Sequence, residues 1–145
     1  MNQAGTVLSP NSKGNDFKIY QTINQALSKS SIQDNRETGT VPLTTLDIAT
    51  LNGGGITYNG IVHISDSSAT AANHKAIRLK NGVNLPASGI TVVSDNPIYI
   101  QGDWNTGGTP PSNSGDPSKP TNSAYTSKPS AIIADSVTLL SLIHI

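Results

Sequence analysis

A short phrase that occurs twice is the feature that most constrains the fold of this chain. Asn59-Gly-Ile-Val-His-Ile-Ser-Asp66 returns 29 positions later as Ser88-Gly-Ile-Thr-Val-Val-Ser-Asp95. Each copy has a glycine, residues that favour strands and a Ser-Asp exit, which is the pattern of one strand between two corners. A repeat period of about 20 to 50 residues is typical of proteins whose units stack, because no unit can bury its apolar face alone.

Apolar and polar residues alternate downstream of residue 55, which is typical of half-buried strands. If these strands pair in sequence as three coils, equivalent strands on successive coils are expected to lie parallel. The predicted fold class is therefore mainly β, a short parallel β-solenoid over residues 55–141. A β-sandwich is the alternative, because the Asn-Gly turns in this region also form hairpins. The expected strands cover residues 61–64, 76–80, 90–93, 97–101, 131–134 and 136–140.

The first part of the chain, residues 1–54, is expected to be an N-terminal lead-in with one or two short helices. Apolar residues spaced i, i+4 and i+8 from Ile19 lie on one helix face and predict a helix over 16–30. Residues 39–43 suggest a short extended piece. A second short helix is predicted over 44–51, and the glycine run that follows is expected to end it.

Two segments are expected to lie outside the core. Residues 105–129 contain five Pro and three Gly but no Ile, Leu, Val or Met. Such a composition cannot bury enough apolar area to order itself, so we expect a disordered inserted loop. Residues 140–145 resemble the translation of a transposon end used to prepare sequencing libraries. The chain is therefore interpreted as a fragment of metagenomic origin.

The composition excludes several classes of function. Charged residues make up 12% of the chain, about half the usual share, and nine basic residues balance nine acidic ones. This balance provides no basic surface for nucleic acid. The absence of Cys excludes disulfides and thiolate metal sites. No apolar stretch is long enough for a membrane span, and the N-terminus does not read as a signal peptide.

A family resemblance rests on the run Gly89-Ile-Thr-Val-Val-Ser-Asp-Asn-Pro-Ile-Tyr-Ile-Gln-Gly-Asp-Trp-Asn105. Ala76-Ile-Arg-Leu-Lys-Asn-Gly82 precedes it, and Lys128-Pro-Ser-Ala-Ile-Ile-Ala-Asp135 follows the insert. Over residues 31–141 the chain resembles envelope proteins of Gram-negative bacteria of the PilX pilus-assembly type, many of which are domains of unknown function. The resemblance implies an extracellular or cell-surface location in the outer envelope, with other envelope or pilus proteins as partners. It implies no catalytic residues.

Aspartates at strand exits are candidate metal ligands. Asp66, Asp95 and Asp103 recur at corners and would approach one another if the coils stack. Carboxylates gathered in this way suit Ca²⁺, or acid-base cleavage of a polysaccharide. Asp at a corner also hydrogen-bonds its own turn, which explains the same pattern without a ligand. No EF-hand loop is present to strengthen the case for Ca²⁺, and no other cofactor is expected.

Tyr99 and Trp104 are candidate carbohydrate-binding residues. Aromatic rings can form a stacking platform for sugars, and surface glycans would then be partners. Trp104 can equally cap the core beneath the insert. His63 and His74 have no metal-ligand spacing and are interpreted as strand or surface side chains.

The sequence therefore favours a non-enzymatic structural or adhesive module of a bacterial cell-surface or pilus-associated protein. A carbohydrate-binding module is the first alternative, and a polysaccharide-active β-helix enzyme is the second. Nucleophile-elbow, phosphate-loop and metalloprotease motifs are all absent from the sequence. We expect no enzyme activity.

Overall fold

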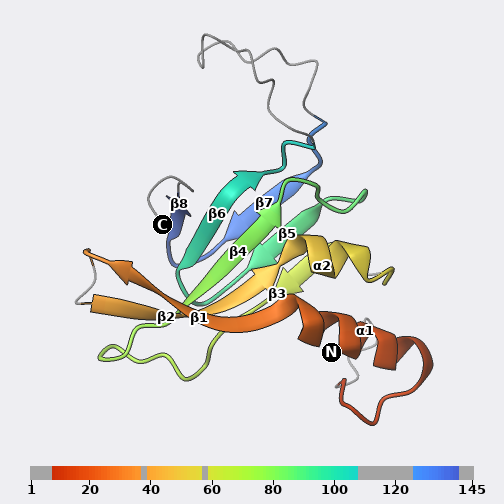
Figure 1. The fold of residues 1–145 in the computed structure, drawn as a ribbon, viewed down its shortest axis with the longest axis horizontal. Helices are drawn as coiled ribbons and strands as arrows, with labels where there is room; N and C mark the ends of the chain where they lie inside the picture. The colour runs from red at the N-terminus through yellow and green to blue at the C-terminus, as the bar shows by residue number, and fades with distance from the viewer. Residues whose placement is uncertain (1–7, 37–38, 57–58, 108–125, 141–145) are drawn as a thin grey trace.

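The computed structural model describes residues 8–36, 39–56, 59–107 and 126–140. In these residues the chain forms two helices and eight strands (Figure 1). The elements in chain order are α1 Gly14–Ala26, β1 Leu27–Asp34, β2 Gly39–Asp47, α2 Ile48–Gly53, β3 Ile61–His63, β4 Ala76–Gly82, β5 Ile90–Val93, β6 Ile98–Trp104, β7 Ser130–Ile133 and β8 Val137–Leu140.

The strands form two sheets. The larger has the order β1-β2-β4-β6-β8 and the smaller the order β3-β5-β7. Every neighbouring pair is parallel except β1 and β2, which are antiparallel. From β3 onward the chain alternates between the sheets, and from β4 onward each strand pairs with the strand two places earlier in the chain. The two copies of the repeated phrase are confirmed as parallel neighbours, with Ile61 opposite Thr91 and His63 opposite Val93.

The predicted fold class, a mainly β chain forming a short parallel β-solenoid, is wrong. The fold is mixed α/β, with a mixed five-stranded sheet, a separate three-stranded parallel sheet and two helices. The reason lies in the first third of the chain, where an antiparallel hairpin and both helices join the strands instead of forming a lead-in. The alternative β-sandwich of hairpins is also wrong, because all pairs among β3–β8 are parallel.

Both predicted helices are present with shifted boundaries. Helix α1 ends at Ala26 and not at residue 30, because β1 pairs with β2 over its whole length. Helix α2 begins at Ile48 and not at residue 44, because the preceding residues pair with β4. The carboxylate of Asp47 accepts a 3.0 Å hydrogen bond from the Thr50 amide, which makes it the N-cap of α2.

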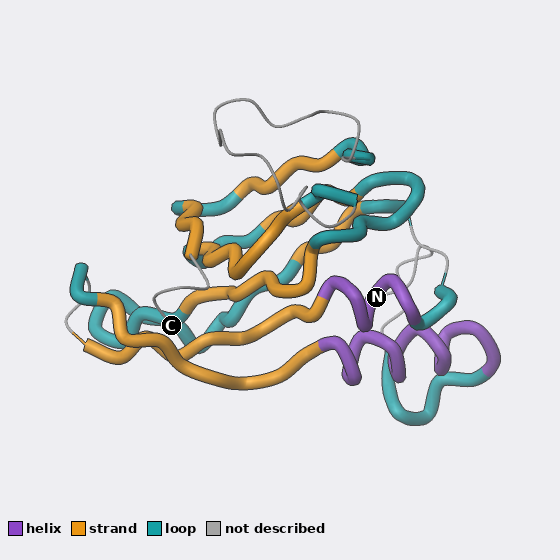
Figure 2. The backbone as a smooth tube through the Cα atoms, turned by 45° about the horizontal axis from the view of Figure 1, so that its top comes forward, coloured by secondary structure: helices purple, strands orange, loops and turns teal. Residues whose placement is uncertain are grey.

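The main core lies between the two sheets. Ile77, Leu79 and Ile98 of the larger sheet and Val92 of the smaller sheet are completely buried. Burying such a side chain contributes about 1.5–3 kcal/mol. Ala26, Ile48 and Leu51 from the helices belong to the same cluster. Both helices gather beside one end of the stacked strands, where β1 and β2 lie (Figure 2).

A second, smaller apolar cluster lies on the outer face of the larger sheet. Val41 and Leu43 of the β1–β2 hairpin pack there with Ala76 and Tyr99. Ile32 and Leu140 lie at its margin and are partly buried. The hairpin therefore covers part of a face that would otherwise be exposed.

The glycine of the repeated phrase occupies a tight, stacked corner. Gly60 and Gly89 have φ angles of +79° and +84°, a region that favours glycine. A Cβ atom at Gly89 would collide with the carbonyl oxygen of Pro129, and one at Gly60 would lie 3.3 Å from that of Gly89. The corners stack too closely for a side chain, which explains why the phrase recurs with glycine.

Part of the expected insert, residues 108–125, and residues 141–145 of the expected adapter-derived end lie outside the described residues. Two hydrogen bonds connect the described ends of the insert. Asn105 Nδ2 donates to the Lys128 carbonyl and Asn105 Oδ1 accepts from the Lys128 amide, both at 2.7 Å. Of the two described helices, neither has the length and apolar character needed to cross a bilayer.

Candidate interaction site

The two aromatic candidates do not form one exposed platform. Tyr99 is only 4% exposed, and its ring belongs to the cluster under the hairpin. Trp104 is half-buried at the far end of the same strand, where its ring lies against Gly82 and its indole N–H donates to Ser130 Oγ at 3.1 Å. Burial of Tyr99 removes its face from any ligand, and the contacts of Trp104 close the core beneath the insert.

Asp66 stabilises the corner that follows β3. Its carboxylate accepts hydrogen bonds from the amide and hydroxyl of Ser68 and from Lys29 Nζ, the last at 3.1 Å. The Ser68 hydroxyl and then Lys29 hold the pKa of Asp66 well below its usual range. The Asp66 amide donates to Oδ1 of the buried Asn96, which follows β5, and so links the two corners. The local bonds match the expectation that Asp stabilises its own turn.

The structure does not bring the three aspartates together. Asp95 is exposed and lies 3.5 Å from Nε2 of His63 on the neighbouring strand, and Asp103 is an exposed residue of β6. Within the described ranges, no three His, Asp or Glu side chains converge in a way that could hold a metal ion. Asp66, Asp95 and Asp103 therefore do not form one carboxylate cluster in the described part of the chain.

A polar clasp, formed by Asp34, Arg36, Tyr99 and Thr138, was not predicted. Asp34 Oδ1 accepts from Arg36 Nε at 2.9 Å, and Arg36 Nη2 donates to Asp34 Oδ2 and, at 3.4 Å, to Thr138 Oγ1. The Arg36 hydrogen bonds hold the pKa of Asp34 well below its usual range. Asp34 and Arg36 are two positions apart, but no sequence signal connects them to Tyr99 or Thr138.

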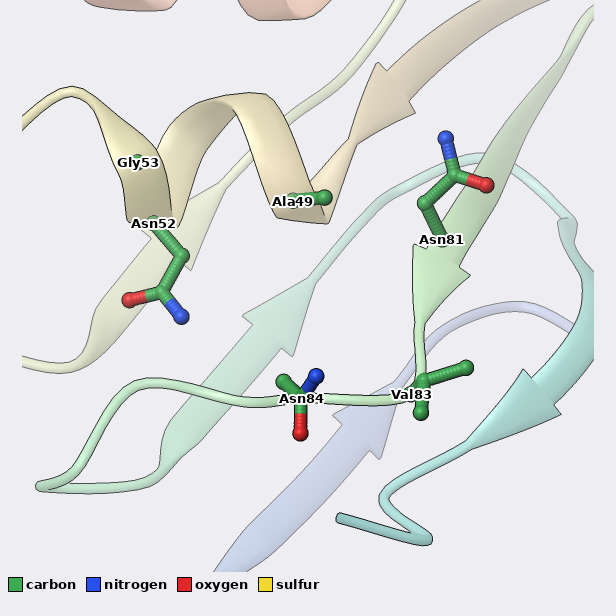
Figure 3. A pocket seen from close by; sticks show the side chains of 6 residues that line it. All are labelled: Ala49, Asn52, Gly53, Asn81, Val83 and Asn84. Carbon is green, nitrogen blue, oxygen red and sulfur yellow. The ribbon is translucent and has the colours of Figure 1, made fainter. Parts of the chain in front are cut away.

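A shallow surface pocket of about 500 Å³ lies between α2 and the end of β4 (Figure 3). Asn52 on the helix, Asn81 at the strand end and Asn84 on the following loop supply amide groups around it. Asn81 has a φ of +56°, and its Nδ2 donates to Asp47 Oδ2 at 2.8 Å. Amides of this kind can hydrogen-bond sugar hydroxyls, but no aromatic ring is among the described lining residues.

The core is uncovered at the end formed by β7 and β8. Leu46, Leu79, Ile100 and Leu139 lie opposite one another on successive strands and form one row across the larger sheet. Val137 ends the neighbouring row, which contains Ile77 and Ile98. Leu79 and Ile100 are 0% and 5% exposed, whereas Leu139 is 77% exposed and Val137 is 47% exposed. All of these side chains lie on the same face of the sheet, but among the described residues no strand pairs with the outer side of β8 next to Val137 and Leu139.

The free edges of these two strands complete the candidate site. In the described part of the chain, β7 pairs only with β5, and β8 only with β6. Between Ser130 and Leu140 the one charged residue is Asp135, in the corner between the strands. Natural edge strands are usually protected by Lys, Pro or bulges. We call the free edges of β7 and β8, with Val137 and Leu139, the open end.

Comparison of the chain with protein-family models, with curated proteins and with solved structures found no match.

Proposed function

We propose that this chain is a non-enzymatic structural or adhesive module of a bacterial cell-surface or pilus-associated protein. The open end carries the proposal, because a charge-free strand edge beside an uncovered core is a surface suited to assembly. Among the large apolar side chains that the structure describes, Leu139 is the most exposed.

The hydrogen bonds that the carboxylates accept also support a structural role. Asp34, Asp47 and Asp66 each accept several hydrogen bonds from the surrounding chain. A general acid in a glycosidase needs a raised pKa and a second carboxylate at a defined distance. In these three residues the pKa is lowered instead. The resemblance of residues 31–141 to envelope proteins agrees with a place on the cell surface.

Two experiments test this function. In a Gram-negative bacterium that carries the gene, an antibody against the domain should label intact cells and their sheared surface fraction. Labelling only after lysis would contradict the proposal. The purified domain should also leave pectin, alginate and other acidic glycans uncleaved. Cleavage that is lost in Asp95→Ala or Asp103→Ala would establish an enzyme instead.

A carbohydrate-binding module is the second candidate, supported by the amide-lined pocket. Glycan binding detected by calorimetry should then weaken in Asn52→Ala and Asn84→Ala. Asn73→Ala is a matched control, because Asn73 is an exposed residue of the loop before β4 and not of this pocket.

A further inference from the structure

We propose that the open end accepts a further pair of extended strands, one hydrogen-bonded in parallel to β7 and the other to β8. The incoming strands carry apolar residues at alternate positions. This inference rests on the proposed function and names the kind of partner that the module binds.

The backbone provides the first reason. β5 pairs with β7 over four residues, and β6 pairs with β8 over four residues, in parallel register. A strand in a sheet uses alternate N–H and C=O groups on each side. The outer side of both β7 and β8 therefore presents groups that a parallel strand can bind, as in recognition by strand addition.

The side chains provide the second reason and specify the partner. Leu46, Leu79, Ile100 and Leu139 form one row across the larger sheet, and only the last is uncovered. A residue placed next in this row must be apolar to bury Leu139. Its neighbours in sequence lie on the other face, so apolar residues are required at every second position. Both faces of a parallel sheet are normally covered, which favours this partner over solvent.

The other edge of the larger sheet differs from the open end. Helices α1 and α2 contribute Ala26, Ile48 and Leu51 to the core near it. Strand β1 forms the edge of the larger sheet there, runs antiparallel to β2 and carries Lys29, which is bonded to Thr44 and Asp66. Parallel strand addition to the larger sheet is therefore expected at β8 and not at β1.

The test extends the full chain after residue 145. A flexible Gly-Ser linker of about 15 residues, which spans roughly 20 Å, is followed by a second copy of residues 88–104, which contain β5 and β6. The control has the same extension with its copies of Ile90, Val92, Ile98 and Ile100, all buried in the native strands, replaced by Asn. We expect the Tm of the first protein to exceed that of the control by about 5 °C or more. Amide exchange in β7 and β8 should also be slower.

Two substitutions in the original domain show whether the added strands raise the Tm by binding at the open end. Leu139→Lys should abolish the gain in Tm. Ile61→Lys should preserve it, because Ile61 is 58% exposed on β3, the opposite edge of the smaller sheet. Equal Tm values for extension and control, or a gain that survives Leu139→Lys, would overturn the proposal.

Sedimentation of the unextended chain separates this partner from a second copy. We expect a monomer. A dimer that is lost in Leu139→Lys would show that a second copy covers the open end and would also overturn the proposal. These results do not depend on where the protein lies in the cell, so they can fail separately from the surface-labelling test.

Discussion

The buried hydroxyl of Tyr99 donates a 2.8 Å hydrogen bond to Oδ2 of Asp34, which lies 65 positions earlier in the chain. Asp34 ends β1, and Tyr99 lies in β6, three strands away in the larger sheet. The bond therefore joins the end of β1 in the hairpin to the outer face of the larger sheet at β6. It explains why a strand that pairs only with β2 is still fixed to the rest of the molecule.

Tyr99→Phe should destabilise the protein by about 1–2 kcal/mol, because a hydrogen bond to a charged, buried carboxylate is lost without a change in ring packing. Urea denaturation followed by circular dichroism measures the change. Tyr20→Phe, the same substitution on α1, should have little effect. Equal stability of wild type and Tyr99→Phe would show that Arg36 alone satisfies Asp34.

Stability should fall in acid, partly because of Asp34. The hydrogen bonds from Arg36 keep its pKa in the folded protein below the value of about 3.9 expected when unfolded. As the pH falls, the unfolded chain therefore binds a proton first. The contribution of Asp34 is complete above about pH 5 and is lost progressively towards lower pH.

Asp34→Asn should reduce this dependence, because an amide does not titrate. The free energy of unfolding of the variant should decline less steeply than that of wild type between about pH 5 and pH 2. Asp103→Asn, at an exposed residue, should retain the wild-type slope. Parallel curves for wild type and Asp34→Asn would contradict the role assigned to Asp34.

Gly89→Ala should be strongly destabilising. The backbone at Gly89 is left-handed, which costs about 1–2 kcal/mol for other residues, and the new methyl group collides with the Pro129 carbonyl. We expect a total loss of about 2–4 kcal/mol in thermal or urea unfolding. Gly53→Ala is the control, since nothing lies within 4 Å of a Cβ there. Similar stabilities of the two variants would refute close stacking of the corners.

Trp104→Ala should destabilise the fold by about 1–3 kcal/mol, because the half-buried ring covers Gly82 and bonds Ser130. Trp104→Phe should recover most of the loss, since it restores a ring but not the indole N–H. Thermal unfolding monitored by circular dichroism measures both changes. If Trp104→Ala left stability unchanged but removed glycan binding, the ring would be a ligand platform and not part of the core.

The strands from residue 61 onward were predictable because their signal is local. Alternation such as Ile77-Arg78-Leu79-Lys80 reports one buried face directly, and the repeated phrase relates β3 to β5. The boundaries of the first third were less predictable. Leu27 continues a helical pattern, yet its partner Leu46 lies 19 positions away, and this pairing makes it part of a strand.

The sequence by itself determined the strand positions, the parallel pairing of the repeats and the glycine corners, because each depends on side-chain alternation or local backbone freedom. Only the tertiary structure decided that the first third joins the larger sheet, that Tyr99 is buried, and that Asp34 binds it. It also decided that Leu139 is exposed, since its residue type and alternation match those of the buried Leu79. Exposure at the open end depends on whether a neighbouring strand is present, and such a neighbour is a property of the assembled sheets and not of the local sequence.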